Sequence, residues 1–208
     1  MSFALGLYWS VAGAQQGVSP DKPQHTILVL GDSLSAEYGL KRGSGWVGIV
    51  QRRLDDAGLD YAMRNASISG DTTSGGLSRL PAALQRHAPD IVIVELGSND
   101  ALRGLSLQMT RDNLARIIEL SQQAGARVLL VGMQIPPNYG RPYTEQFRQL
   151  FEQLANERRT AFVPFLLDGM AQDRSLFQDD GMHPNEQAQE ILANNVWTGL
   201  RPMVAMPR

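Results

Sequence analysis

Three short apolar runs, rich in β-branched residues, constrain the fold of this chain more than any other feature. They lie at residues 27–30 (ILVL), 91–94 (IVIV) and 128–131 (VLLV). A strand with one face in solvent alternates apolar and polar residues, whereas a parallel strand covered on both faces is continuously apolar. Weaker runs follow helical segments at residues 61–63 and 161–163. The sequence therefore predicts an open parallel sheet of five strands.

Helical periodicity separates these runs. Apolar residues at positions 114, 117 and 118, and at 147, 150, 151 and 154, have the spacing of one helix face. Further helices are predicted at about residues 46–57, 77–87 and 185–200, with Gly58 and Pro202 beyond the first and the last. Alternating strands and helices with right-handed crossovers predict an α/β fold, a three-layer α/β/α sandwich with a flavodoxin-like sheet. Functional residues collect at the carboxyl ends of such strands.

The composition is that of a globular protein without a strong charge. The 208 residues are 43% hydrophobic, and the net charge is −2. A chain with this balance lacks the positive footprint of a nucleic-acid-binding protein, so we expect no nucleic-acid partner. The length suits one domain, which we place at residues 25–208. Because the chain contains no cysteine, any nucleophile must be an oxygen or a lysine.

Residues 1–14 are interpreted as the remnant of a signal peptide. A short apolar run ends in Ala12-Gly13-Ala14, which would place cleavage after Ala14 and leave residues 15–24 as an N-terminal segment. A basic region before the run is missing, so an N-terminal extension without function is the alternative. A membrane-spanning helix needs about 20 apolar residues, and Ser10 and Gly13 interrupt this run too early. We expect a periplasmic or secreted bacterial protein without stable membrane insertion.

The first polar block follows the first strand directly. It reads Gly31-Asp32-Ser33-Leu34-Ser35, a turn of small residues that is expected to lead into a helix. Ser33 would then lie where backbone N–H groups and a helix N-terminus converge, which makes it a candidate nucleophile. The alternative is an ordinary N-cap serine in a strand-to-helix turn.

Two further blocks follow the second and third strands. Residues 65–76 are small and polar, and their backbone amides suit an anion-binding nest in which Gly70 offers an oxyanion donor. A solvated loop is the alternative, and a nucleotide site is disfavoured because no glycine-rich phosphate motif is present. Asn99, in Gly97-Ser98-Asn99-Asp100, places a side-chain N–H donor after the central strand, although Asn-Asp is also a common turn.

The fourth block, residues 179–184, brings a carboxylate and an imidazole together. Asp180 precedes His183 by three residues in a turn stiffened by Gly181 and Pro184. This spacing lets Asp180 accept a hydrogen bond from His183 Nδ1, which leaves Nε2 free to act as a general base. Asp179 is the less favoured partner, and an acidic turn with an exposed histidine is the structural alternative.

The remaining histidines are interpreted as structural or solvated. His25 precedes the first strand, and His87 closes a helix where a cation suits the helix dipole. No H-E-x-x-H motif or other set of clustered ligands occurs. We therefore expect neither a metal nor a cofactor.

Taken together and in order, these blocks resemble those of the SGNH (GDSL) hydrolase family, over about residues 26–200. Residues 65–72, 95–97 and 137–140 look like its bacterial multifunctional thioesterase, arylesterase and lysophospholipase group. The resemblance implies that Ser33 is the nucleophile, His183 the base and Asp180 its orienting carboxylate. It implies an oxyanion hole formed by the backbone N–H groups of Ser33 and Gly70 and the side-chain amide of Asn99. One departure is Ser98, where this group commonly has glycine, so the loop may be stiffer there or gain a hydroxyl contact.

Apolar residues after the third and fourth strands are candidates for the walls of an acyl or aryl groove. They are Ala101, Leu102, Leu105, Met109, Ile135, Pro136, Pro137 and Tyr139. The alternative is that they only pack the loops onto the core. The predicted function is hydrolysis of small-molecule acyl esters and thioesters by a monomer through an acyl-enzyme intermediate. A carbohydrate or other short-chain acetylesterase is the alternative enzyme, and a non-catalytic binding module is the alternative from another class.

Overall fold

The computed structural model describes residues 25–205. The predicted signal-peptide remnant at 1–14 and the segment at 15–24 lie outside the described residues. Within the described part of the chain, no helix has the length and apolar character needed to cross a bilayer.

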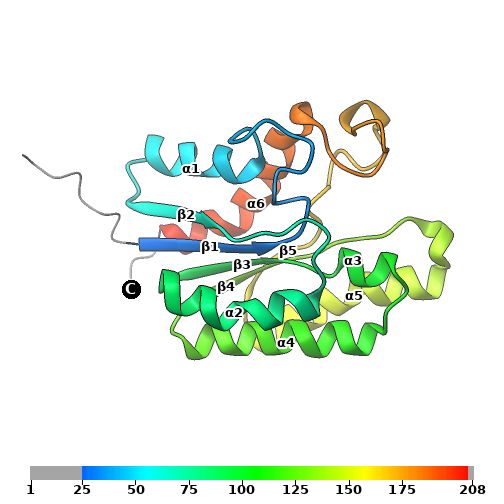
Figure 1. Ribbon diagram of the computed structural model, residues 1–208, viewed down its shortest axis with the longest axis horizontal. Coiled ribbons are helices and arrows are strands. Elements are labelled where there is room, and N and C mark those ends of the chain that lie inside the picture. The colour runs from blue at the N-terminus through cyan, green and yellow to red at the C-terminus, as the bar shows by residue number, and fades with distance from the viewer. Residues whose placement is uncertain (1–24, 206–208) are drawn as a thin grey trace, which may run out of the picture.

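A five-stranded parallel sheet forms the middle layer (Figure 1). Its strand order is β2-β1-β3-β4-β5, and every neighbouring pair is parallel. The bounds are β1 (His25–Gly31), β2 (Tyr61–Asn65), β3 (Ile91–Glu95), β4 (Arg127–Val131) and β5 (Ala161–Val163). Each strand contains the apolar run from which it was predicted. The prediction of a flavodoxin-like sheet is therefore confirmed.

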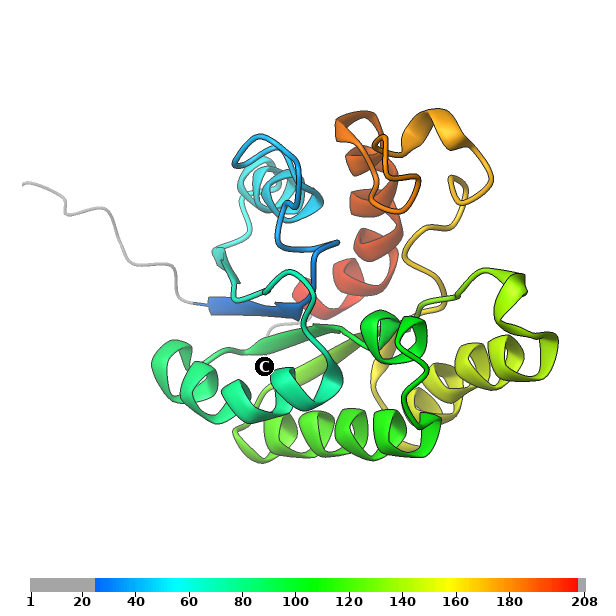
Figure 2. The same cartoon turned by 45° about the vertical axis from the view of Figure 1, so that its right-hand side comes forward.

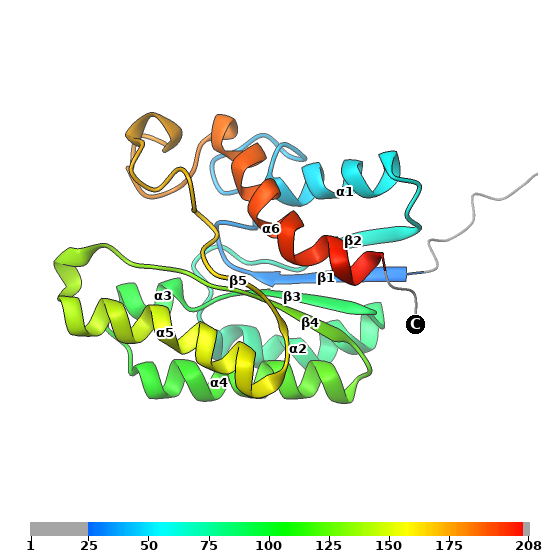
Figure 3. The ribbon, with the colours of Figure 1, turned by 180° about the vertical axis from the view of Figure 1, so that it is seen from behind.

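Helices cover both faces of the sheet, as Figures 1 and 3 show from opposite sides. One layer contains α1 (Trp46–Asp56) and α6 (Gln189–Val204), and the other contains α2 (Thr73–His87), α4 (Leu107–Gln123) and α5 (Arg141–Arg158). Shorter elements are α3 (Ser98–Leu102) and the 3₁₀ helices η1 (Pro137–Tyr139), η2 (Arg174–Leu176) and η3 (Glu186–Ala188). The predicted three-layer sandwich is present.

The core lies on both sides of the central strands. The apolar residues of β1 and β3, at positions 27–30 and 91–94, are completely buried. This double burial explains why their sequences are continuously apolar. The rigid centre of the molecule therefore lies directly beneath the loops that leave the carboxyl ends of β1 and β3.

The first turn of α2 differs from the sequence prediction. The helix begins at Thr73 rather than at residue 77, after the N-cap Thr72, whose side chain accepts from the Gly75 N–H. The Gly-rich residues before 77 resemble a loop in sequence, but glycine is needed for close packing. A Cβ on Gly76 would lie 2.3 Å from Leu96 Cδ1. Residues 73–76 are therefore helical and are not part of an anion-binding nest.

The end of α6 also differs from its prediction. Pro202 was expected to lie beyond the helix, but α6 continues to Val204 with Pro202 inside it. The next two side chains, Met203 and Val204, are buried. Their packing keeps the last turn helical although proline cannot donate a backbone hydrogen bond there.

The strand register aligns the starts of the loops that follow β1 and β3. Gly31, the last residue of β1, pairs with Glu95, the last residue of β3. The chain moves from β1 to β2 on one side of the sheet and later to β3 on the other, so β1 and β3 flank the topological switch point. The loops after these strands diverge there, and the gap between their starting points suits a ligand. Figure 2 shows α3 beyond this edge of the sheet.

Candidate active site

The turn that carries Ser33 is shaped by the side chain before it. Asp32 Oδ1 accepts from the Leu34 N–H at 3.0 Å, and the Asp32 carbonyl accepts from the Ala36 N–H at 2.9 Å. Irregular turns follow, and the next helix begins only at Trp46. The predicted helix after Ser33 is therefore absent. Glu37 and Gly39, with φ of 60° and 69°, take left-handed conformations that cannot continue a helix.

The Asp180–His183 turn lies on the segment after β5. Asp180 Oδ1 accepts from the N–H groups of Met182 and His183, both at 2.9 Å, and Oδ2 contacts His183 Nδ1 at 2.6 Å. Gly181 has a φ of 65° within this turn, which favours glycine. One carboxylate thus orders both the backbone and the imidazole ring.

Ser33, His183 and Asp180 form one chain of contacts. His183 Nε2 lies 2.9 Å from Ser33 Oγ, and its Nδ1 is the atom that contacts Asp180. The ring of Tyr38 packs against the imidazole, with centroids 4.4 Å apart. This is the order of contacts that transfers a serine proton to an imidazole while a carboxylate stabilises the imidazolium.

Asp180 is held in its ionised form. The backbone N–H of His183 lowers the pKa of this carboxyl to about 2, assisted by the His183 side chain and the Met182 N–H. The carboxylate is therefore charged at neutral pH. Asp179, the less favoured candidate, is exposed and adjacent.

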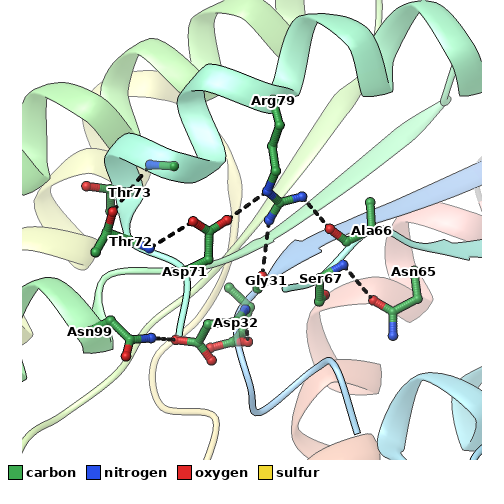
Figure 4. A network of polar contacts seen from close by, with 12 residues as sticks. Gly31, Asp32, Asn65, Ala66, Ser67, Asp71, Thr72, Thr73, Arg79 and Asn99 are labelled. Atoms are coloured by element: carbon green, nitrogen blue, oxygen red, sulfur yellow. Dashed lines mark hydrogen bonds and ion pairs between the residues drawn. The ribbon is translucent and has the colours of Figure 1, made fainter. Parts of the chain in front are cut away.

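Three N–H donors border the Ser33 hydroxyl. Within the described residues, the backbone N–H groups of Ser33 and Gly70 have no acceptor in the protein. Asn99, on α3, donates one amide hydrogen to Asp32 Oδ2 at 3.0 Å, and its second amide hydrogen has no acceptor among these residues (Figure 4). Ser33, Gly70 and Asn99 line the same pocket. These groups are the kind that bind a developing oxyanion.

Ser98, the departure from the family pattern, contributes no hydrogen bond here. Its side chain is buried, and its Oγ has no partner among the described residues. Asp100 instead fixes this loop, because its carboxylate accepts from the Thr73 N–H at 2.9 Å and the Thr73 hydroxyl at 2.5 Å. The loop with Asn99 is therefore tied to the start of α2.

Two buried carboxyl groups lie beneath the Ser33 turn. Glu95 Oε2 accepts from the Ser35 hydroxyl at 2.7 Å, and Glu95 Oε1 has no partner within the described part of the chain. Burial raises the pKa of Asp32 to about 6, and burial together with the nearby Asp32 charge raises the pKa of Glu95 well above its ordinary value. The interior therefore favours the protonated form of both groups.

This pair predicts a pH dependence of stability. We expect the free energy of unfolding of the native sequence, relative to that of Asp32→Asn, to fall as pH rises from 3.8 through about 6. The folded protein holds the Asp32 proton more tightly than the unfolded chain, so this stabilisation is complete below the ordinary pKa and is lost above the raised one. Urea unfolding of both proteins from pH 4 to 7 measures the difference. A difference that stays constant or grows with pH would contradict the assignment.

A cavity of about 840 Å³ opens over the three contacting residues. Its walls include Leu102, Ile135, Pro136 and Pro137, which are four of the predicted wall residues. This volume lies within the range of small-molecule sites, about 300–1,000 Å³.

Four predicted wall residues do not line this cavity. Ala101 is fully buried, and Leu105 lies beyond the turn at Gly104, where its carbonyl accepts from Tyr143. Met109 lies in the first turn of α4, where Ser106 caps its N–H. The Tyr139 hydroxyl contacts the Leu102 carbonyl at 3.5 Å. The contacts of Leu105 and Tyr139 join neighbouring loops, whereas the Met109 side chain is exposed.

Sequence reasoning missed several wall residues on other segments. They are Tyr38, Met133, Phe165, Leu167, Phe177 and Met182. Phe165 and Leu167 follow β5, so the rule that strand ends carry function would have included them. Tyr38 lies in an irregular turn, where no periodicity marks it. Within residues 25–205, no group of three His, Asp or Glu side chains is arranged to hold a metal ion.

Comparison with known proteins gives consistent matches. The profile of the GDSL-like Lipase/Acylhydrolase family matches residues 29–191. The chain is 48% identical to Esterase TesA of Pseudomonas aeruginosa over 86% of this chain and 89% of the relative. It is 40% identical to thioesterase 1/protease 1/lysophospholipase L1 of Escherichia coli, over 86% of this chain and 85% of the relative.

A solved structure extends this likeness to the fold. The psychrotrophic esterase EstA from Pseudoalteromonas, inhibited by monoethylphosphonate, superposes with a TM-score of 0.83. Its sequence is 37% identical, and the match covers 88% of this chain and all of that chain.

Proposed function

Because this chain belongs to the GDSL-like Lipase/Acylhydrolase family and is an esterase of that family, we propose that it hydrolyses esters and thioesters with Ser33 as the nucleophile. His183 is the general base and Asp180 its orienting partner. The N–H groups of Ser33 and Gly70 and the Asn99 amide form the oxyanion hole. The observation that carries this proposal is the 2.9 Å contact between Ser33 Oγ and His183 Nε2 beside three N–H donors.

In the first half-reaction, His183 Nε2 takes the proton of the Ser33 hydroxyl while Oγ attacks the acyl carbonyl. The carbonyl oxygen becomes an oxyanion that accepts hydrogen bonds from the three donors. When the tetrahedral intermediate collapses, the bond to the alcohol or thiol breaks, and His183 donates its proton to that leaving group. The acyl group remains on Ser33.

In the second half-reaction, His183 removes a proton from a water molecule that attacks the acyl carbonyl. Collapse of the second intermediate breaks the Ser33 ester, and His183 returns the proton to Ser33 Oγ. The products are a carboxylic acid and the restored enzyme. The ester or thioester and one water molecule are the only reactants that this sequence needs besides the chain's own residues.

The apolar wall supports substrates with an acyl or aryl group larger than acetyl. Leu102, Met133, Ile135, Phe165 and Leu167 provide apolar surface next to the reacting serine. We propose aryl esters, acyl thioesters and lysophospholipids with short to medium chains as substrates; the thioesters and lysophospholipids agree with the name of the Escherichia coli relative. The alternative within the family is an acetylesterase for carbohydrates or other short-chain esters.

Labelling with a fluorophosphonate tests whether the chain is an enzyme or a binding module. The reagent forms a covalent adduct with an activated serine, so we expect mass spectrometry to find one adduct, on Ser33. A folded protein that stays unlabelled while it binds acyl compounds would instead support the binding module.

Hydrolysis of p-nitrophenyl esters of increasing chain length distinguishes the two enzymes. If the apolar wall binds the acyl chain, kcat/KM rises from acetate to a medium chain, because each buried methylene contributes about 0.8 kcal/mol. A steep preference for acetate would support the acetylesterase instead. The matched control is the variant Tyr139→Phe, because Tyr139 does not line the cavity. The dependence of kcat/KM on chain length in this variant should match that of the native protein.

We also propose that the catalytic domain spans residues 25–208 and acts as a monomer in the periplasm or outside the cell. The Ala12-Gly13-Ala14 pattern supports export with cleavage after Ala14. N-terminal sequencing of the protein recovered from the periplasm tests this. A mature chain that still begins at Met1 in the cytoplasm would contradict it.

A further inference from the structure

Arg79 extends from α2 to the carboxyl ends of β1 and β2 and is mostly buried, with 21% of its side chain exposed (Figure 4). Its Nε donates to Asp71 Oδ2 at 2.7 Å, and its Nη2 donates to the Gly31 carbonyl at 3.2 Å. Its Nη1 donates to the Ala66 carbonyl. One planar guanidinium thus connects three segments of the chain.

Two of these acceptors are next to the proposed oxyanion donors. Gly31 lies two residues before Ser33, and Asp71 directly follows Gly70. The Gly31 carbonyl also accepts from the Ile68 N–H at 3.1 Å. Both Arg79 and Ile68 therefore connect the Gly70 loop to the carbonyl of Gly31, the last residue of β1.

The Gly70 loop is a turn that closes on itself. The Asp71 N–H donates to the Ile68 carbonyl at 3.1 Å, and Gly70 has a φ of 76° within this turn. Ile68 is held by Gly31, and Asp71 is held by Arg79, which is itself held by Gly31. The result is a closed ring of contacts around the peptide that presents the Gly70 N–H.

Besides this ring, the Thr72 N–H donates to Asp71 Oδ1 at 3.0 Å at the end of the turn. Ile68 and Ser69 are exposed, so the core does not pack against them. The Gly70 carbonyl accepts from Arg103 at 2.8 Å, but Arg103 is itself exposed and on the solvent side. The buried contacts of Arg79 therefore join the Gly70 turn to the segment that leads into Ser33.

We propose that Arg79 is a positioning residue that holds the Gly70 N–H in register with the Ser33 turn, so that both backbone donors reach the same oxyanion. This inference rests on the proposed function. Removing one partner of a buried ion pair lowers stability, and an oxyanion donor acts only within about 2.7–3.1 Å of its target. Loss of Arg79 therefore affects both folding and catalysis, and the test has to separate the two.

Lysine should not replace Arg79. A guanidinium presents several donors in one plane, whereas an ammonium is a compact point charge. Lysine retains the charge next to Asp71 but cannot hold both the Gly31 and the Ala66 carbonyls in the same plane. If charge alone mattered, Arg79→Lys would behave like the native protein.

The test measures kcat and KM for Arg79→Met and Arg79→Lys. We expect kcat to fall about 100-fold with little change in KM, since a small displacement of a catalytic donor has that effect. The affinity for an alkyl trifluoromethyl ketone, which forms a tetrahedral adduct with the serine, should fall in proportion to kcat/KM. The matched control is Arg53→Met, because Arg53 pairs with Glu190 at 2.6 Å between α1 and α6 and has a similar exposure of 24%. It should keep its kcat.

Two further measurements distinguish positioning from a general structural role. Added guanidinium ion should restore part of kcat in Arg79→Ala but not change Arg53→Met. Asp71→Asn should also lower kcat, and its effect should not add to that of Arg79→Lys because both interrupt the same ring of contacts. If Arg79→Met does not fold, Arg79→Lys and Asp71→Asn decide the question.

Failure of this inference and failure of the proposed function give different results. If the native protein is not labelled at Ser33, the proposed function fails and the inference fails with it. If the native protein is labelled and active, the inference alone is overturned when both Arg79→Lys and Arg79→Met keep kcat within about twofold. It is also overturned if their losses match a loss of folded protein and guanidinium restores nothing.

Discussion

Ser33→Ala will lower kcat by about 10⁵- to 10⁶-fold while the protein stays folded. The reason is that Ser33 Oγ, 2.9 Å from His183 Nε2, is the proposed atom that forms the covalent intermediate. Without it, only the oxyanion donors and substrate binding remain, and such residues typically retain about 10³-fold acceleration over water. Steady-state kinetics with a p-nitrophenyl ester measure the loss, and thermal unfolding checks the fold.

The matched control for this variant is Ser35→Ala. Ser35 is in the same turn, but its hydroxyl donates to the buried Glu95 at 2.7 Å. Its removal should lower stability, because a buried carboxyl loses a donor, while Ser33 still takes the fluorophosphonate label. If Ser33→Ala retained activity above a tenth of the native value, the nucleophile would have to be another residue.

Asp180→Asn will lower kcat by about 10³- to 10⁴-fold. The carboxylate contacts His183 Nδ1 at 2.6 Å, and the asparagine amide can present a donor at that position instead. Nδ1 would then act as an acceptor, and the proton would move to Nε2, where it prevents the ring from accepting the Ser33 proton. The imidazolium would also lose its nearby negative charge.

The control for this prediction is Asp179→Asn, which removes an adjacent exposed carboxylate without touching the imidazole. We expect kcat within about twofold of the native value, since surface charges have small effects. The pH dependence of kcat/KM, measured for both variants, distinguishes loss of the contact with His183 Nδ1 from loss of a surface charge. Equal losses in the two variants would show that the net charge of the turn matters and not the contact with Nδ1.

The sheet could be predicted because its physical cause is local in sequence. Parallel strands covered on both faces need continuous apolar residues, and positions 27–30 and 91–94 meet that need with completely buried side chains. Helix boundaries were harder to predict from the sequence. The first turn of α2 contains glycines that sequence patterns assign to loops. Close packing explains them, because a Cβ on Gly75 would lie 1.9 Å from Asp71 Oδ1 and a Cβ on Gly76 would lie 2.3 Å from Leu96 Cδ1.

The candidate site was partly predictable for a similar reason. Ser33 and Asn99 each stand in a short polar block directly after a strand, so one rule about strand ends suggests both. His183 lies well past β5, and its spacing from Asp180 indicates it instead. Tyr38 and Phe177 have no such mark, because their places in the cavity wall depend on how irregular segments pack. The missing helix after Ser33 likewise depends on the left-handed backbone at Glu37 and Gly39.

The division of the site between two parts of the chain affects how its substrate range can change. The proposed nucleophile and oxyanion donors lie on the segments that follow β1, β2 and β3. Residues 165–183, after the last strand, supply both the imidazole and a large share of the wall, including Phe165, Leu167, Phe177 and Met182. Replacing residues 165–177 by those of a relative would therefore change the wall of the acyl pocket. The segments with Ser33, Gly70 and Asn99 and the Asp180–His183 turn would keep the native sequence, so residues 165–177 are the natural target for redesigning selectivity.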